Sequence, residues 1–202
     1  QRTADHEPPE PPELNVAVIG FGKLGLLHAG TVGGLSGSRF AALADPSSVV
    51  RDIAKQRMPD VRFYSGHKAL LAYGGIDAAF IASPTGLHIP IALACVDAGV
   101  PVFIEKPLAL SADQARPLCQ ALARRPVVNM VGYMGRYLET FRKAKEIVSQ
   151  GVLGQLQMVR ASMYIGQLFQ TGKGWRYEKE KSGGGVLITQ NAHLIDKLIW
   201  FF

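Results

Sequence analysis

The stretch VAVIGFGKLG, Val16–Gly25, decides the fold that we expect for this chain. Gly20, Gly22 and Gly25 have G-x-G-x-x-G spacing, directly after a strand-like apolar run and directly before a helical pattern. Glycines at these positions permit a tight turn and let a pyrophosphate approach backbone N–H groups at the positive end of a helix. The stretch therefore predicts a dinucleotide-binding turn, and the alternative is a glycine turn that holds no ligand.

An acidic residue further along supports the same interpretation. Asp45 ends the second expected strand, 20 residues beyond Gly25, where a carboxylate can accept hydrogen bonds from a pair of ribose hydroxyls. A carboxylate there repels a 2′-phosphate, so the sequence favours NAD over NADP as the cofactor. Arg51 would weaken that preference if its side chain folded back toward Asp45.

Short apolar runs alternate with amphipathic segments from Leu14 onward, which is typical of βαβ units on a parallel sheet. Strands are expected at Asn15–Ile19, Arg39–Ala44, Val61–Tyr64, Ala78–Ala82, Val100–Ile104 and Val127–Gly132. Helices are expected at about Leu24–Val32, Ser47–Arg57, His67–Tyr73, His88–Ala98 and Ala112–Arg124. We therefore predict an α/β Rossmann domain with a doubly wound parallel sheet over residues 14–134. Ser111 with Gln114 predicts a capping box, and Gly99 predicts a helix C-cap.

The rhythm changes at residue 135, and we expect the start of a second domain over residues 135–202. A helix over about Glu139–Gln150 precedes a long strand over Gln155–Ile165, a polar glycine-rich loop and a terminal apolar helix. The strand has no visible partner in the sequence, and the chain ends on the apolar LIWFF. We therefore expect a truncated piece of a longer protein, because an isolated strand cannot satisfy its backbone.

Composition predicts a globular, soluble and cytoplasmic protein. Apolar residues make up 48% and charged residues 19% of the chain, and no run approaches the roughly 18 apolar residues of a membrane helix. The net charge of +6 comes mainly from residues 136–181, which carry no nucleic-acid motif, so we expect a solvated face rather than nucleic-acid or membrane binding. Cys95 and Cys119 have no CxxC or His-rich neighbours, so no metal is expected. Residues 1–13, rich in proline and charge, predict a disordered arm, and an exported form stays an alternative because no initiator Met is present.

Two further motifs follow in order: ASPTGLH at Ala82–His88 and EKP at Glu105–Pro107, ahead of the GGG…H…D segment near the end of the chain. With GFGKLG they resemble the Gfo/Idh/MocA family of oxidoreductases, which includes glucose-fructose oxidoreductase and inositol dehydrogenase. The resemblance implies a Rossmann domain followed by an α/β domain with a large, mostly antiparallel sheet, and substrate in the cleft between them. It also implies a homo-oligomer for the full-length protein, because that sheet commonly forms the subunit interface in the family.

The resemblance assigns roles to individual residues. It implies that Lys106 and His193 are catalytic, and that Glu105 approaches the cofactor ribose beside a Lys-Pro bond that is often cis. The cofactor-binding set is Gly20, Phe21, Gly22, Lys23, Leu24, Gly25, Asp45, Ser83, Pro84, Thr85, His88, Glu105 and Lys106. The substrate-binding set is Arg136, Trp175, Arg176, Thr189 and His193.

Two positions depart from the family pattern. Thr189 stands one helical turn before His193, where the family most often has a carboxylate, and Thr85 replaces a frequent Asn. The first change removes a relay partner that many inositol and sugar dehydrogenases use. The division of acid and base roles between Lys106 and His193 therefore stays open.

The chemistry of alcohol oxidation suits a lysine at this place. Lys106 follows a predicted strand, at the edge where open α/β sheets bind ligands. Its ammonium can stabilise charge on a substrate oxygen and exchange a proton with it, most efficiently when burial lowers the lysine pKa. The alternative is a surface lysine held by Glu105.

The terminal helix supplies the second candidate group. In one continuous helix that starts near Val186, Thr189, His193 and Asp196 lie on one polar stripe, which either lines a wet cleft or faces solvent. Gly183–Gly185 cost backbone entropy just before it. We expect these glycines to turn the stripe toward the nicotinamide site, with a flexible surface loop as the alternative.

These features together predict an NAD(P)-dependent dehydrogenase or reductase that acts on CH–OH groups. It would transfer a hydride between a nicotinamide cofactor and a small sugar, cyclitol or related hydroxylated substrate. The alternatives are an NAD-dependent glycosidase of the same family and a non-catalytic dinucleotide-binding regulator. Tyr133 and Arg136 either line the site or pack between the domains, and His88 either shapes the nicotinamide pocket or caps the next helix.

Overall fold

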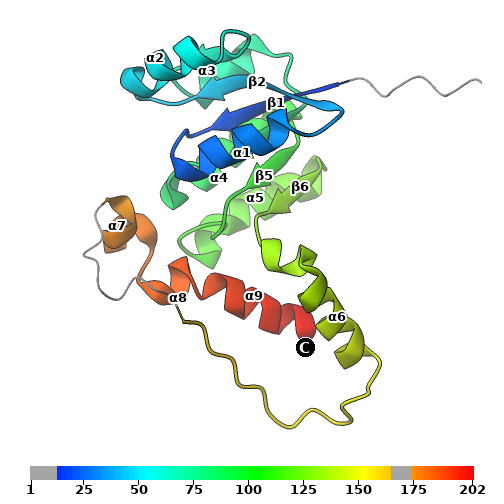
Figure 1. Cartoon of the computed structure of the whole chain (residues 1–202). Coiled ribbons are helices and arrows are strands. Elements are labelled where there is room, and N and C mark those ends of the chain that lie inside the picture. The colour runs from blue at the N-terminus through cyan, green and yellow to red at the C-terminus, as the bar shows by residue number, and fades with distance from the viewer. Residues whose placement is uncertain (1–12, 165–173) are drawn as a thin grey trace, which may run out of the picture.

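The computed structural model of the protein describes residues 13–164 and 174–202, so almost all of the arm expected over residues 1–13 lies outside the described residues. A six-stranded sheet with strand order β3-β2-β1-β4-β5-β6 dominates the fold (Figure 1). All its neighbouring strands are parallel. The strands are β1 (Leu14–Ile19), β2 (Ser38–Ala44), β3 (Arg62–Tyr64), β4 (Ala78–Ile81), β5 (Val102–Ile104) and β6 (Asn129–Val131). This order is that of dinucleotide-binding Rossmann folds, and the predicted doubly wound α/β fold is confirmed.

Helices cover both faces of the sheet because each strand is apolar on both sides. Val18 and Leu43 pack with Ala29 and Ala54, which belong to α1 (Lys23–Gly33) and α2 (Ser48–Arg57). The alternate residues of the strands, such as Ile19, pack against the other three helices. These are α3 (His67–Tyr73), α4 (His88–Ala98) and α5 (Ala112–Arg124). In Figure 1, α1 lies in front of the sheet and α4 behind it.

The direction of the chain across the sheet changes between β1 and β4. These two strands lie side by side and end together, with Ile19 opposite Ile81. One leads into α1 and the other into the short helix η1 (Thr85–Leu87) and α4. A crevice forms at such a switch point because the two following connections leave toward opposite faces of the sheet.

Sequence patterns located the elements of the first domain to within a few residues. α3, α4 and α5 have the predicted bounds, and Gly99 ends α4 in the left-handed region, with φ of 75°. Ser111 caps α5 by accepting a hydrogen bond from the Gln114 backbone N–H. The Gln114 side chain accepts from the Leu110 N–H instead of the Ser111 N–H, so only half of the predicted capping box forms in the expected way.

The long strand predicted over Gln155–Ile165 is wrong for the residues that the structure describes. Residues 155–164 have no regular secondary structure, and Ile165 lies outside the described residues. An extended segment becomes a strand only when a neighbouring strand takes its backbone hydrogen bonds, and residues 13–164 and 174–202 supply none here. For the same reason the described residues contain no antiparallel second-domain sheet.

The terminal helix is not continuous, so the prediction of one helix from Val186 is also wrong. It is divided into α8 (Val186–Thr189) and α9 (Ala192–Phe201). The Asn191 N–H donates back to the Val186 carbonyl, and the His193 N–H donates to the Gln190 carbonyl. These bonds span five and three residues instead of four, so the helical register breaks between Thr189 and His193.

The end of the chain packs under the carboxyl side of the sheet through η2 (Met134–Tyr137) and α6 (Glu139–Ser149), as Figure 1 shows. Lys197 of α9 lies over the Phe141 ring of α6, 3.9 Å from its centre. Short helices η3 (Trp175–Tyr177) and α7 (Lys179–Ser182) precede α8. Within the described ranges, no helix has the length and apolar character needed to cross a membrane.

Candidate functional site

The glycine turn between β1 and α1 has the geometry of a phosphate cradle. Gly20 has φ of +93°, and a Cβ there would lie 2.8 Å from the Ser83 backbone nitrogen. A Cβ on Gly25 would lie 2.0 Å from the Gly20 carbonyl oxygen, whereas a Cβ on Gly22 would meet no atom within 4 Å. The outer glycines are therefore needed for the turn itself, and Gly22 leaves open space at the start of α1, where a pyrophosphate fits the helix N-terminus.

Asp45 lies beside this turn and helps to hold it. One carboxylate oxygen accepts a hydrogen bond from the Phe21 N–H at 2.8 Å, and the other accepts from the Ser47 N–H at 2.9 Å. Each oxygen keeps a further lone pair for a ribose hydroxyl. Arg51 does fold back, because its guanidinium donates to the Asp45 carbonyl oxygen at 2.6 Å.

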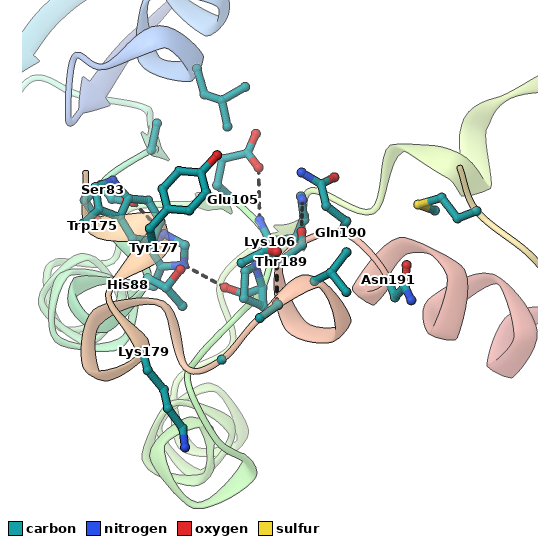
Figure 2. A pocket seen from close by; sticks show the side chains of 18 residues that line it. Ser83, His88, Glu105, Lys106, Trp175, Tyr177, Lys179, Thr189, Gln190 and Asn191 are labelled. Atoms are coloured by element: carbon teal, nitrogen blue, oxygen red, sulfur yellow. Dashed lines mark hydrogen bonds between the residues drawn. The ribbon is translucent and has the colours of Figure 1, made fainter. Parts of the chain in front are cut away.

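Two cavities meet at the carboxyl edge of the sheet. One, of about 530 Å³, follows the glycine turn and reaches Asp45. The other, of about 680 Å³, lies between the sheet edge and α8 and contains Lys106 (Figure 2). Both are lined by Leu24, Ala82, Ser83 and Trp175. A long ligand can therefore lie in the first cavity and present one end to the second.

Lys106 is held at both ends. Its backbone N–H donates to the Glu105 carboxylate at 3.1 Å, and its ammonium donates to the Thr189 carbonyl oxygen at 2.7 Å, as Figure 2 shows. The Lys106-Pro107 peptide bond is cis, as the resemblance implied. The Thr189 hydroxyl donates to the Gly185 carbonyl, so Thr189 contacts the lysine through its backbone and not through its side chain.

The Glu105 carboxylate is ionised despite its burial. Burial raises the pKa of Glu105, but the hydrogen bond and charge of His28, together with Lys106, outweigh burial and hold the pKa below its usual value. The folded protein therefore keeps a negative charge a few atoms from the candidate catalytic ammonium.

His88 connects two segments that help to line the larger cavity, one at Ser83 and one at Pro107. Its ring is 1% exposed, and its nitrogens lie 2.9 Å from the carbonyl oxygens of Ser83 and Pro107. Burial lowers the pKa of His88, although the two carbonyls oppose that effect. His88 lines the larger cavity, but the alternative that it caps α4 is wrong, because Leu87 is the N-cap and no side chain makes a capping hydrogen bond there.

Stability should decrease below neutral pH because of His88. Its pKa is lower in the folded than in the unfolded protein, so the unfolded state binds more protons near pH 6.5. The free energy of unfolding therefore decreases as the pH falls through that value. We expect His88 to contribute a fall of up to about 1.4 kcal/mol per pH unit below about pH 6.5 to the free energy of unfolding, measured with urea. His88→Gln should be less stable at pH 8 and should show a smaller decrease toward pH 5.5. An equal decrease in both proteins would contradict this assignment; Glu105 titrates in a separate window below pH 4.5, where its pKa lies in the unfolded state.

His193 lies next to Tyr133, with ring centres 6.1 Å apart in an edge-on arrangement. Burial, followed by the charge of Lys106, lowers the pKa of His193. Burial, followed by the charge of Asp196, raises the pKa of Tyr133. His193 is not among the residues that line the larger cavity in the described part of the chain, so its catalytic role stays a prediction.

Arg136 and Asp196 join η2 to α9. The Arg136 Nε donates to Asp196 Oδ2 at 2.9 Å, and a second bond joins Nη2 to Oδ1. The Asp196 side chain is 9% exposed and that of Arg136 is 41% exposed. This pair holds the helix that carries His193 against η2, which follows β6, whereas substrate binding by Arg136 stays a prediction.

Removal of the Asp196 carboxylate should loosen α9. We expect Asp196→Ala to lower the free energy of unfolding by about 1–2 kcal/mol, since Arg136 loses a two-point partner but can still reach water. Asp52→Ala, which breaks the exposed Asp52–Lys55 pair, is the matched control and should change stability by less than about 0.5 kcal/mol. Urea unfolding of both variants provides the measurement. Equal losses of stability in the two variants would contradict the role of the Arg136–Asp196 pair in holding α9.

The tertiary structure brings most of the predicted cofactor-binding residues to one crevice. The two cavities are lined by Gly20, Phe21, Gly22, Lys23, Leu24, Asp45, Ser83, Pro84, Thr85, His88, Glu105 and Lys106. Trp175 and Thr189 of the predicted substrate-binding set also line the larger cavity, whereas the Arg176 side chain lies outside what the structure describes. Gly25 is buried where α1 meets the turn.

Sequence reasoning missed His28, whose imidazole contacts the Glu105 carboxylate. It also missed Tyr177, Gln190 and Asn191, which line the larger cavity. A signal for His28 existed, because it stands four residues after Leu24 and so shares the face of α1 that meets the cavities. No local signal places the other three, since they come from segments that only the tertiary fold brings to the sheet edge.

Comparisons with known proteins agree with this arrangement. Residues 14–133 match the oxidoreductase family with the NAD-binding Rossmann fold, and residues 141–202 match the GFO/IDH/MocA C-terminal domain. An inositol 2-dehydrogenase of Rubrobacter xylanophilus is 32% identical over 196 residues, which cover 93% of this chain and 52% of that protein. Inositol 2-dehydrogenase 1 of Saccharopolyspora erythraea is 34% identical over 149 residues, 72% of this chain and 44% of that protein.

A solved structure of similar shape is that of myo-inositol 2-dehydrogenase from Lactobacillus plantarum. It has a TM-score of 0.77 and 29% identity, and the match covers 94% of this chain and 56% of that one. The chain thus spans about half the length of the relatives that it matches.

Proposed function

This chain belongs to the Gfo/Idh/MocA family of oxidoreductases and has the NAD-binding Rossmann fold of that family, and on this premise we propose that its protein is an NAD-dependent dehydrogenase. The reaction transfers a hydride between the nicotinamide ring and a CH–OH carbon of a sugar, a cyclitol or a related hydroxylated compound. Cyclitols are the first substrates to test, because inositol dehydrogenases are among its relatives.

The position of Lys106 is the observation that carries the proposal. Its ammonium lies in the larger cavity, which shares Leu24, Ala82 and Ser83 with the cavity along the glycine turn. A dinucleotide with its phosphates at Gly22 can extend toward this shared wall. A substrate hydroxyl in the larger cavity would then lie within reach of the lysine.

The glycine turn fits the cofactor, because Gly20 and Gly25 pack closely against backbone atoms, whereas Gly22 faces open space in which the phosphates would lie. Gly20, Gly22 and the start of α1 would hold the pyrophosphate, and Asp45 would accept hydrogen bonds from the adenosine ribose. Two backbone N–H groups fix the orientation of the Asp45 carboxylate. NAD is favoured over NADP, since this carboxylate repels a 2′-phosphate. The Arg51 guanidinium does not change that preference, because it binds the backbone carbonyl of Asp45 and not its carboxylate.

When bound, the nicotinamide ring accepts or supplies the hydride. Lys106 stabilises negative charge on the substrate oxygen and takes up or returns the hydroxyl proton. Lys106 belongs to the first domain, and its hydrogen bond to the Thr189 carbonyl directs the ammonium across the larger cavity toward α8. We propose His193 as the second proton-transfer group, because it lies on α9, close enough to Lys106 and Glu105 for their charges to act on its imidazole.

The direct test is a substrate screen with the full-length natural protein. NADH appearance is followed by ultraviolet absorbance with NAD and a panel of cyclitols and sugars, and reduction of the corresponding ketones is followed in reverse. Turnover with NAD and at least one cyclitol or sugar is the expected result. Hydrolysis of glycosides without net NADH would favour the glycosidase, and nucleotide binding without any turnover would favour the regulator, for which Thr189 in place of a carboxylate is the supporting observation.

A further inference from the structure

His28 forms a close contact that the proposed reaction does not yet use. Its Nε2 lies 2.7 Å from Glu105 Oε1, and the two side chains are 16% and 12% exposed. The imidazole packs against the rings of both Phe80 and Phe103, with ring centres 5.2 and 5.1 Å away. Those two rings also stack on each other, 4.8 Å apart. His28 is therefore fixed in a closely packed apolar setting, and its polar partner is a carboxylate.

This contact decides where the Glu105 carboxylate points. One oxygen faces His28, and the other accepts the Lys106 backbone N–H. The Lys106 ammonium donates in another direction, to the Thr189 carbonyl. A carboxylate and an ammonium on adjacent residues would otherwise attract each other strongly in a part-buried place.

We propose that His28 is a positioning residue that keeps the Glu105 carboxylate on α1 and so leaves the Lys106 ammonium directed at α8, in the lining of the larger cavity. The idea rests on the proposed function of Lys106 and adds a residue to it. His28 acts from the helix whose N-terminus would hold the pyrophosphate, so the site that binds the cofactor and the site that moves the proton share one helix.

Loss of the imidazole would release Glu105 toward the nearest cation. Among the described residues, histidines from three helices interact electrostatically with Glu105: His28 from α1, His88 from α4 and His193 from α9. Of these, His88 is already bound to two carbonyls and His193 lies beside Tyr133. A released carboxylate would therefore move to Lys106 and stabilise its charged form, so that less of the lysine would be the neutral amine that can react or accept a proton.

The experiment measures the reactivity of Lys106 in the full-length natural protein without nucleotide or substrate. Lysine amines are labelled with trace isotopic acetic anhydride at several pH values and quantified by mass spectrometry, with exposed Lys55 as the internal reference. His28→Leu removes the donor and keeps apolar contact with both rings, while His28→Gln keeps an N–H donor. Phe103→Leu is the packing control, because it disturbs the same rings and leaves the imidazole in place.

In His28→Leu we expect labelling of Lys106 to slow about 10-fold relative to Lys55, as an approaching carboxylate raises the lysine pKa by about one unit. His28→Gln and Phe103→Leu should label within about twofold of the natural protein. Glu105→Gln combined with His28→Leu should restore fast labelling, because the competing carboxylate is gone. Turnover in the oxidation direction should fall about 10-fold in His28→Leu with nucleotide affinity within about twofold, and the acidic limb of its pH profile should move upward by about one pH unit.

Either of two results in the His28 variants overturns the proposal: unchanged Lys106 labelling in His28→Leu, or equally slow labelling in His28→Gln. Slow labelling in Phe103→Leu overturns it as well, since packing alone would then explain the effect. If no substrate is ever turned over, the function of the site is wrong, but the labelling experiment still tests the His28–Glu105–Lys106 arrangement. Thermal unfolding of each variant shows that the comparison is made on folded protein.

Discussion

Lys106→Met is expected to lower turnover by about 100- to 10,000-fold while NAD and NADH bind within about twofold of the natural protein. The methionine keeps most of the side-chain volume but can neither stabilise charge on the substrate oxygen nor carry a proton. The nucleotide contacts that we propose lie mainly in the other cavity, along the glycine turn and Asp45. Turnover numbers and calorimetric nucleotide affinities, measured on the same preparations, provide the comparison.

Two further variants separate the roles of the lysine. Lys106→Arg keeps the positive charge but stays protonated at all relevant pH values, so it should remain slow if proton transfer is needed. Lys55→Met, on the exposed side of α2, is the control for loss of a lysine and should keep normal turnover. Survival of near-normal turnover in Lys106→Met would mean that the proton is carried by another group, with His193 as the next candidate.

Gly25→Ala is expected to destabilise the protein by about 3 kcal/mol or more and to abolish nucleotide binding. The new Cβ would lie 2.0 Å from the Gly20 carbonyl oxygen and 3.4 Å from Val18, so the start of α1 would have to move away from β1. Backbone atoms cannot swing aside like the end of a flexible side chain. Urea unfolding and calorimetry with NADH measure the two losses.

The other glycines of the region serve as controls. Gly22→Ala should keep normal stability, because its Cβ meets no atom within 4 Å, but should weaken nucleotide binding by about 10- to 100-fold, equivalent to about 1.4–2.8 kcal/mol, since the methyl group enters the space for the pyrophosphate. Gly30→Ala, in the middle of α1 with open space around it, should bind normally and gain up to about 1 kcal/mol of stability. Normal nucleotide affinity in Gly22→Ala would show that the phosphates do not pass this turn.

Local patterns predicted the first domain well because its signals are local. Buried strands of a parallel sheet are apolar on both faces, and a helix such as α4 ends where Gly99 can adopt positive φ. The same reasoning failed at residues 155–164 and at the junction of α8 and α9. A strand depends on a partner that may be distant in sequence, and the break after Thr189 depends on hydrogen bonds that periodicity does not reveal.

In the candidate site, too, some features could be predicted from local patterns and others could not. Spacing and residue type identified the glycine turn, Asp45 and Lys106, since each stands at the carboxyl end of a predicted strand and such ends meet at one edge of a parallel sheet. Spacing could not show that Arg136 binds Asp196, that Thr189 uses its carbonyl, or that Glu105 faces His28. Each of these contacts joins side chains or backbone groups far apart along the chain.

The sequence by itself thus determined the order of strands and helices in the first domain, the place of the dinucleotide turn and the nature of the candidate catalytic amine. Only the tertiary structure decided which partner each charged group takes, with Glu105 on α1 and the Lys106 ammonium on α8. The physical reason is range: backbone preference and apolar periodicity act over a few residues, whereas the direction of a buried charge is set by groups from other elements, which only folding brings within hydrogen-bond distance.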